Sequence, residues 1–341
     1  MSEKLHVRAT VSTVTGTGVA GRGAGQINNP FGVILGPDGD LWFCDLDNRQ
    51  VRRQDRGSGA ISTVAGTGDL GHTGDGGPAL AATLNTPHEI CFNEAGDLFI
   101  VERDNHAVRR VDARTGTIST YAGTGEAGFS GDGGPADRAR LRQPHSIAID
   151  GRGDLLICDI GNHRVRRVDR VTGLISTFAG NGEPGPTPDE APVAGTPLNG
   201  PRTIVFGPDG TMYLALREGN AIYAIDPSGS RLRRIAGTGA KGHTGDGGPA
   251  LNATLAGPKG LAYGPEGCLY IADTENHVIR SVDLASGVIT TVLGTGQRGD
   301  GPESSPLVCA LARPHGLFAP APGELLVADS ENHRIRLLRR G

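Results

Sequence analysis

The segment 144–169, PHSIAIDGRGDLLICDIGNHRVRRVD, decides the fold because its pattern recurs, with variations, six times along the chain. Each copy opens with a proline and an apolar run, turns at glycine and aspartate, and continues through a second run that usually ends in an acid. A corner such as Asn162-His163-Arg164 and a third run follow. The opening prolines are Pro30, Pro87, Pro144, Pro201, Pro258 and Pro314, spaced by 57, 57, 57, 57 and 56 residues. Such a fixed period is typical of a repeat fold.

Each copy contains four short apolar runs separated by tight turns, which predicts an all-β protein. Four strands of about four to six residues cannot bury both faces alone, so each unit has to pack against the next. The sequence therefore predicts a six-bladed β-propeller of four-stranded blades that begin near residues 30, 87, 144, 201, 258 and 314. Because the repeat is unbroken, we expect a single domain over residues 1–341.

The N-terminus indicates how the ring closes. Residues 11–14 and the following Gly-Thr-Gly copy residues 61–64 and their own Gly-Thr-Gly, which belong to the fourth run of the first repeat. The sixth repeat ends at Leu338 without a fourth run of its own. We therefore predict that residues 11–15 supply the outer strand of the last blade.

Composition and charge argue against several classes of function and location. The 55 glycines and 22 prolines recur at fixed offsets and therefore mark turns. A net charge of -4 provides no global basic field to recruit nucleic acid. No apolar run is long enough to span a membrane, and residues 1–10 lack a signal-peptide pattern, so we expect a cytoplasmic protein. The cysteines, expected to be small buried hydrophobes rather than disulfides, are Cys44, Cys91, Cys158, Cys268 and Cys309.

The residues that follow the opening prolines are expected at one mouth of the central channel. They are Phe31, His88, His145, Arg202, Lys259 and His315. Because strands alternate in direction within a blade, the acids that close the second strand belong to the same end. They are Asp45, Glu102, Asp159, Asp273 and Asp329, with Leu216 in the fourth blade. Strand ends and loops on a rigid scaffold are the usual place for function, so this mouth is the expected site.

Three histidines near a shared axis favour a metal site. Neutral imidazole is a common metal ligand, and three of them leave open positions for water and substrate, as in zinc sites. We therefore predict that His88, His145 and His315 bind a divalent ion, with zinc the first choice. The alternative is that Pro-His merely starts a strand and each ring bonds a neighbouring acid.

The second repeat carries the most titratable residues near the predicted mouth. Glu89 stands where the other repeats carry glycine, serine or threonine, and Glu102 stands where most carry aspartate. A carboxylate beside a metal-bound water would be a general base, so Glu89 and Glu102 are the predicted catalytic residues. The alternative is that Glu89 only pairs with Arg103 or Arg202 at the rim.

Blade 4 departs from the pattern by gaining arginine and losing its acid. Arg202 and the neighbouring Lys259 could orient a substrate carboxylate or phosphate. Arg217 replaces part of the usual corner, and the apolar Phe31 lies beside a short connection that could form the entrance. The predicted substrate-binding residues are Arg202, Lys259, Arg217 and Phe31.

Other recurring residues are interpreted as structural. The histidines after the corner asparagines recur with the fold and are expected to pack or cap that corner. The Gly-Asp-Gly-Gly-Pro loops lack the acid-rich spacing of a calcium site. Arginine pairs such as Arg109-Arg110 recur at one strand position, which favours ion pairs over RNA binding.

The Asn-His-Arg corners, the Leu-x-Ile-x-Asp strands and the Ala-Gly-Thr-Gly connections closely resemble NHL-repeat proteins over about residues 11–338. That family includes RNA-binding domains, protein scaffolds and enzymes such as the peptidyl-hydroxyglycine amidating lyase. The resemblance to that lyase implies zinc at His88, His145 and His315 and a catalytic arginine at Arg202. Its tyrosine has no counterpart at a matching rim position here.

The leading hypothesis is a metal-assisted lyase or hydrolase acting on a small anionic substrate at the channel mouth. The alternative is a non-catalytic binding module for a protein or small ligand. RNA binding is a third hypothesis, which sparse aromatic residues and the acidic balance disfavour.

Overall fold

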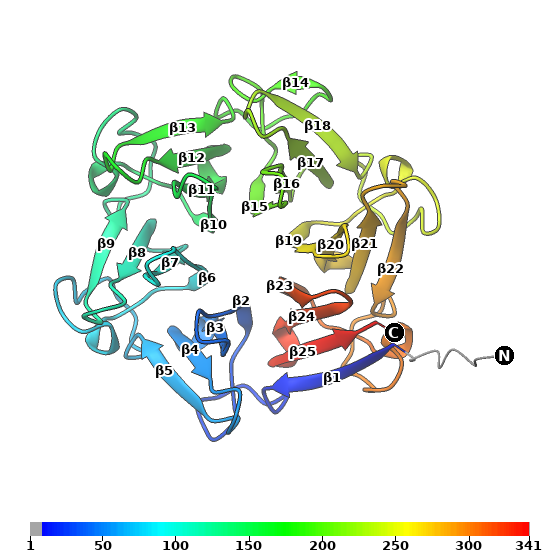
Figure 1. Ribbon diagram of the computed structural model, residues 1–341, viewed down its shortest axis with the longest axis horizontal. Helices are drawn as coiled ribbons and strands as arrows, with labels where there is room; N and C mark the ends of the chain where they lie inside the picture. The colour runs from blue at the N-terminus through cyan, green and yellow to red at the C-terminus, as the bar shows by residue number, and fades with distance from the viewer. Residues whose placement is uncertain (1–8, 341) are drawn as a thin grey trace.

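The computed structural model describes residues 9–340, which form a ring of six antiparallel sheets around a central axis (Figure 1). The innermost strand of each sheet lies next to the axis and the last strand lies at the periphery. The predicted six-bladed propeller is therefore confirmed. Within the described residues, no helix is long and apolar enough to cross a bilayer.

The blades follow one another around the ring in chain order. Blade 1 contains β2 (Pro30–Leu35), β3 (Leu41–Asp45), β4 (Gln50–Gln54) and β5 (Ile61–Ala65). Blade 2 contains β6 (Pro87–Phe92), β7 (Leu98–Glu102), β8 (Ala107–Val111) and β9 (Ile118–Ala122). Blade 3 contains β10 (Pro144–Ile149), β11 (Leu155–Asp159), β12 (Arg164–Val168) and β13 (Ile175–Ala179).

The second half repeats this order with one addition. Blade 4 contains β15 (Pro201–Phe206), β16 (Met212–Leu216), β17 (Ala221–Ile225) and β18 (Arg231–Ala236), plus the two-residue β14 (Ala191–Pro192) on its outer edge. Blade 5 contains β19 (Pro258–Gly264), β20 (Cys268–Asp273), β21 (Val278–Asp283) and β22 (Ile289–Leu293). Blade 6 contains β23 (Pro314–Ala321), β24 (Glu324–Asp329) and β25 (Arg334–Arg339).

Single turns of 3-10 helix occupy two recurring places. Those in the connections between blades are η2 (Ala79–Ala81), η3 (Ala136–Arg138), η5 (Ala250–Asn252) and η7 (Pro306–Val308). Those at the corner after the second strand are η1 (Leu46–Asn48), η4 (Ile160–Asn162), η6 (Thr274–Asn276) and η8 (Ser330–Asn332). The connections that lead into blades 2, 3, 5 and 6 therefore each contain one helical turn.

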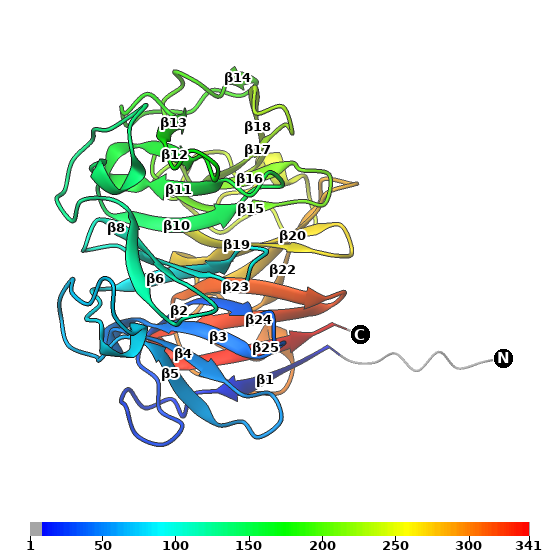
Figure 2. The same ribbon diagram turned by 60° about the vertical axis from the view of Figure 1, so that its left-hand side comes forward.

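The chain ends close the ring as predicted. Strand β1 (Thr10–Thr15) pairs antiparallel with β25 and completes blade 6, as Figure 2 also shows. Val11 lies opposite Leu338, and both side chains are buried in the cluster between blades 5 and 6. The hydrophobic core is divided in this way among the blade interfaces, so each interface depends on its two neighbours.

Val11→Asp should open this closure. Val11 is 3% exposed, and burying a valine contributes about 1.5–3 kcal/mol, to which an unpaired buried carboxylate adds a further penalty. We expect the melting temperature to fall by roughly 5–10 °C. Ser12→Asp, one residue along the same strand and only partly buried, should change it little. Equal melting of the two variants in calorimetry would show that β1 does not hold the ring.

Candidate functional site

A recurring irregularity aims the residue after each opening proline into the channel. In blade 3, Pro144 pairs with Asp159 and Ser146 pairs with Cys158, which leaves His145 as the extra residue of a bulge. The same shift isolates His88 in β6 and Arg202 in β15. Because a bulge re-aims a side chain, it explains how one sequence position delivers its chemistry to the axis from every blade.

The structure brings the predicted mouth residues together. The Phe31 ring stacks on the His315 ring with 4.0 Å between centroids, and it meets the His88 ring edge-on at 4.5 Å. The His88 and His145 rings are 4.6 Å apart. Side chains from blades 1, 2, 3 and 6 are therefore in contact at this mouth. The apolar ring of Phe31 contacts both His88 and His315, which the metal hypothesis did not anticipate.

Arg202 reaches from blade 4 to blade 2. Its Nη2 lies 3.3 Å from Nε2 of His88, and the arginine is only 3% exposed. Within residues 9–340, its Nε has no hydrogen-bond partner, and no carboxylate forms a salt bridge with it. Burial lowers the pKa of Arg202 to about 10, so the guanidinium stays charged at neutral pH.

The contact with Arg202 assigns the tautomer of His88. A guanidinium can only donate, so Nε2 of His88 has to be the acceptor. In a neutral imidazole the proton is then on Nδ1. That Nδ1 is buried and has no partner among the described residues. The mouth therefore contains two buried N–H donors, on His88 and Arg202, that no acceptor within residues 9–340 satisfies.

His145 and His315 have the same tautomer as His88, but their Nδ1–H groups have acceptors. Nδ1 of His145 donates to the carbonyl oxygen of Gln143 at 2.7 Å. Nδ1 of His315 lies 2.9 Å from Oγ of Ser330, whose single proton is donated to the carbonyl oxygen of Pro30 at 2.6 Å. Nδ1 is therefore the donor in both rings. Each presents an unprotonated Nε2, the form that ligates metals or accepts protons.

All three histidines are held neutral. Burial, followed by the charge of Arg202, keeps the pKa values of His88 and His145 well below their usual range. Burial and the charge of Lys259 do the same for His315. The imidazoles therefore add donors and acceptors to the mouth but no positive charge.

Glu89 is the acid of this site. It lines the small cavity below the mouth together with Arg202, and burial raises its pKa to about 7 despite the opposing charge of Arg202 and a hydrogen bond from Ser146. The alternative partner Arg103 is instead paired with Asp104 at 2.8 Å. Glu89 is thus poised to gain or lose a proton near neutral pH.

The other two predicted cations already have acidic partners. Nζ of Lys259 donates to Oε1 of Glu275 at 2.7 Å, and the same carboxylate binds Arg313. Nε of Arg217 donates to Glu218 at 2.5 Å. Arg202 therefore differs from both, because no acid in the described part of the chain is bonded to it.

The cavity enclosed by these residues is small, about 10 Å³, which is room for roughly one water molecule. It is lined by Phe31, Gly32, His88, Glu89, Arg202, Thr203, Lys259, Gly260, Leu261, His315, Gly316 and Leu317. No group of three His, Cys, Asp or Glu side chains within residues 9–340 is arranged to hold a metal ion. The present arrangement does not fit a three-histidine metal site, because the only lone-pair nitrogen of His88 is bonded to Arg202. Zinc binding stays a prediction.

Glu102 and its counterparts lie in buried corners behind the mouth. Oε2 of Glu102 accepts a 2.6 Å hydrogen bond from Asn105 and lies 3.8 Å from Arg109. Burial raises its pKa to about 7. The corresponding pairs are Asp45 with Asn48, Asp159 with Asn162, Asp273 with Asn276, and Asp329 with Asn332. The structure therefore places Glu102 in a repeated corner and not among the residues that line the cavity.

The residues interpreted as structural make structural contacts. Nδ1 of the corner His106 accepts a 3.0 Å hydrogen bond from the backbone of Gln143 in the next blade. In the arginine pairs, the first member is buried and forms an ion pair, as Arg109 does with Asp75 at 2.5 Å. The loop aspartates thus hold strand arginines as well as backbone amides.

The sequence analysis did not single out three residues that shape the mouth or the corners behind it. Ser330 orients His315, and Glu275 neutralises Lys259; both belong to the short corner after the second strand, where polar residues replace apolar ones in some repeats. Tyr223 stands where the other blades carry the buried arginine. A comparison of the third strands could have identified Tyr223, because its repeat position is fixed.

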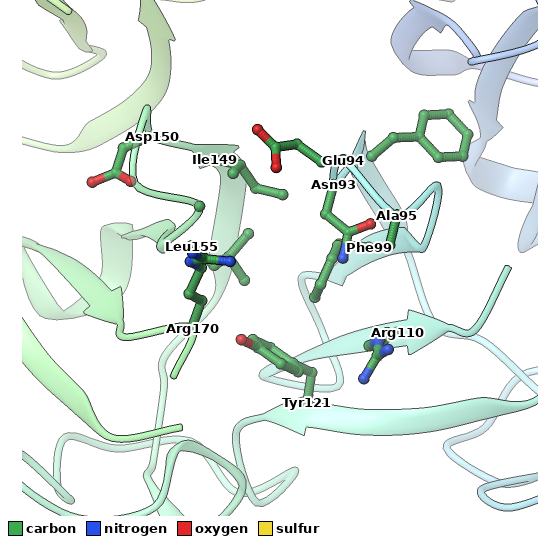
Figure 3. A pocket seen from close by; sticks show the side chains of 12 residues that line it. Asn93, Glu94, Ala95, Phe99, Arg110, Tyr121, Ile149, Asp150, Leu155 and Arg170 are labelled. Atoms are coloured by element: carbon green, nitrogen blue, oxygen red, sulfur yellow. The ribbon is translucent and has the colours of Figure 1, made fainter. Parts of the chain in front are cut away.

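Larger grooves lie at the opposite ends of the inner strands. The groove between blades 2 and 3 has a volume of about 530 Å³ and includes Phe99, Tyr121, Glu94 and Arg170 in its walls (Figure 3). Similar grooves of about 340 and 550 Å³ occur between blades 3 and 4 and between blades 6 and 1. Because the groove recurs between blades, it is a feature of the repeat rather than of one blade.

Family models agree with the architecture. The model described as the NHL repeat matches residues 141–168, and the model described as the teneurin NHL domain matches residues 234–314. Together with the six blades, these matches support the predicted NHL-repeat β-propeller.

Relatives of known name are larger proteins. The chain is 28% identical to Protein SUPPRESSOR OF QUENCHING 1, chloroplastic, of Arabidopsis thaliana, over 75% of this chain and 25% of that protein. It is 25% identical to human NHL repeat-containing protein 2, over 75% of this chain and 39% of that protein. The chain thus spans well under half the length of these relatives.

Solved structures with the same fold have several functions. An auxiliary nutrient binding protein from Bacteroides thetaiotaomicron aligns with a TM-score of 0.68 at 18% identity, covering 97% of this chain and 76% of that one. A gluconolactonase from Xanthomonas campestris aligns with a TM-score of 0.63 at 16% identity, covering 100% of this chain and 94% of that one. A virginiamycin B lyase from Staphylococcus aureus aligns with a TM-score of 0.56 at 18% identity, covering 94% of this chain and 82% of that one. At these identities, the likeness shows the fold alone.

Proposed function

We propose that the channel mouth binds the anionic group of a small molecule, with Arg202 as its anchor. The observation that carries this proposal is the buried guanidinium of Arg202, which has no carboxylate bonded to it in residues 9–340. A charge buried without a partner is costly, and an anionic ligand would remove that cost. The Nδ1–H of His88, which is also buried without a partner in residues 9–340, is a further free donor at the mouth.

The surrounding charges favour an anion over a cation. Arg202 and Lys259 both lie at the mouth, the three imidazoles are neutral, and Glu89 is half protonated near pH 7. Lys259 shares its charge with Glu275, so it adds a weaker attraction. Because the cavity holds roughly one water, the anionic group has to displace that volume or shift Phe31 and its neighbours.

Arg202→Met should weaken this binding strongly. We expect saturable, salt-sensitive binding of formate or acetate to the wild-type protein in calorimetry, and a loss of at least about tenfold in Arg202→Met, since a charged hydrogen bond contributes about 1.5–3 kcal/mol. Arg231→Met removes the same charge from an exposed side chain of the same blade and should leave binding intact. Equal binding by all three proteins would reject the site.

Anion affinity should rise as the pH falls from about 8 to about 6. The pKa of Glu89 in the folded protein is about 7, so protonation below that value removes a negative charge beside Arg202. Glu89→Gln should remove the part of this rise that comes from Glu89 and leave only a smaller rise between about pH 8 and pH 7, because burial lowers the pKa of Lys259 to about 8. Arg202 stays charged throughout the window, and the thiols of Cys44, Cys91 and Cys158 stay neutral because burial raises their pKa values. A pH-independent wild-type affinity would contradict the assignment.

Catalysis by a lyase or hydrolase is the second candidate function. His145 and His315 present unprotonated Nε2 atoms, and Glu89 has a pKa of about 7, so proton acceptors and a proton donor are available beside an anion anchor. The gluconolactonase and the lyase that share the fold support this candidate. The nutrient binding protein supports the non-catalytic alternative, in which the same mouth only holds its ligand.

Hydrolysis of small lactones separates the two candidates. Ring opening releases a carboxylate that Arg202 would hold, so we expect turnover of simple five- and six-membered lactones, with competitive inhibition by the product. His145→Ala should lower kcat, and the corner variant His106→Ala should not, since His106 accepts a bond from the backbone of blade 3. Acetate binding without turnover of any lactone would favour the binding module.

A further inference from the structure

We infer that Arg202 is the specificity-determining residue of the channel mouth and makes it select an anion in place of a divalent metal ion. The inference rests on the proposed anion site and adds a reason for its selectivity. By donating to Nε2 of His88, Arg202 uses the nitrogen that this histidine would need to ligate a metal.

His88 has only one nitrogen that could bind a metal ion. A neutral imidazole has one nitrogen that can accept a hydrogen bond or ligate a metal, and the other carries the proton. In His88 the accepting nitrogen is Nε2, and it faces Arg202 at 3.3 Å. Metal ligation by His88 would require this bond to break and would place two positive charges side by side in a buried site.

His145 and His315 show the arrangement in which a histidine can bind a metal ion through Nε2. In His145 and His315, Nδ1–H is held by an oxygen acceptor and Nε2 is left unprotonated. Fixing one ring nitrogen in this way is how metal-ligating histidines are usually oriented. The rings of His88 and His145 are 4.6 Å apart, whereas Phe31 contacts the rings of His88 and His315. Without the guanidinium, His88 and His145 are the pair best placed to share an ion.

The position of Arg202 in the repeat gives independent support. It occupies the slot that holds histidine in blades 2, 3 and 6. Its side chain contacts His88 across the mouth, and blade 4 also carries Leu216 where the other blades have a corner acid. Blade 4 therefore both lacks the corner acid and supplies the arginine that donates to His88 of blade 2.

Zinc titration of tag-free protein tests the inference. We expect wild type to bind no Zn²⁺ that depends on His145, and Arg202→Met to gain at least about tenfold in Zn²⁺ affinity. The gain should be lost in Arg202→Met/His145→Ala. Arg202→Lys keeps a cationic donor and should gain nothing. Zinc bound by wild type and lost in His145→Ala would overturn the inference, as would Arg202→Met without any gain.

The tautomer of His88 gives a readout that needs no variant to fold. Nitrogen-15 NMR of wild type should show His88 protonated on Nδ1, with His145 and His315 also protonated on Nδ1 but without a charged donor at Nε2. A proton on Nε2 of His88 would overturn the inference even if Arg202→Met is unstable. Acetate binding is measured separately, so failure of the anion site and failure of metal exclusion are distinguishable.

Discussion

A buried carboxylate at the end of the second strand holds together the corner of each of five blades. In blade 3, Oδ1 of Asp159 accepts from the backbone of Arg142 at 2.7 Å, just before the inner strand begins. Oδ2 accepts from Asn162 at 2.7 Å and lies 3.5 Å from Arg166, which in turn binds Asp132 of the incoming loop. One acid therefore joins the inner strand, the corner, the third strand and the connection from the previous blade. The position of the mouth residue depends on this joint.

These acids fix geometry at some cost in stability. Burial raises the pKa of Asp159 to about 6, above the unfolded value of about 3.9, so the folded state holds the proton more tightly. The stability that comes from this proton is complete below about pH 4 and is lost as the pH rises through about 6. Blade 4 shows that the pair is replaceable: Leu216 and Tyr223 stand in place of acid and arginine, and both are buried. Such replacement by apolar residues agrees with the small net contribution that buried ion pairs make to the free energy of unfolding.

The features that follow from the 57-residue repeat could be predicted from the sequence. Spacing and turn residues were sufficient for six blades, for the closing strand predicted at residues 11–15, and for the set of side chains at the mouth. It could not predict that Arg202 crosses to His88, because that contact depends on channel width and side-chain rotamers. The pairing of Lys259 with Glu275 was missed for the same reason. Blade 4 was interpreted as gaining net charge, but Tyr223 removes an arginine as well, so the whole corner pair is lost.

The unpaired charge lies in blade 4 because Glu218, the acid of its corner, is bonded to Arg217 and forms no salt bridge with Arg202 among residues 9–340. In blade 5 the residue at the same repeat position, Glu275, is bonded to the mouth residue Lys259. Arg202 therefore faces the channel without a carboxylate from its own blade. Its nearest acid, Glu89, has a pKa of about 7 and is only partly ionised at neutral pH. The guanidinium is therefore incompletely neutralised inside a buried ring of neutral imidazoles. Electrostatics of this kind attracts an anion and repels a divalent cation.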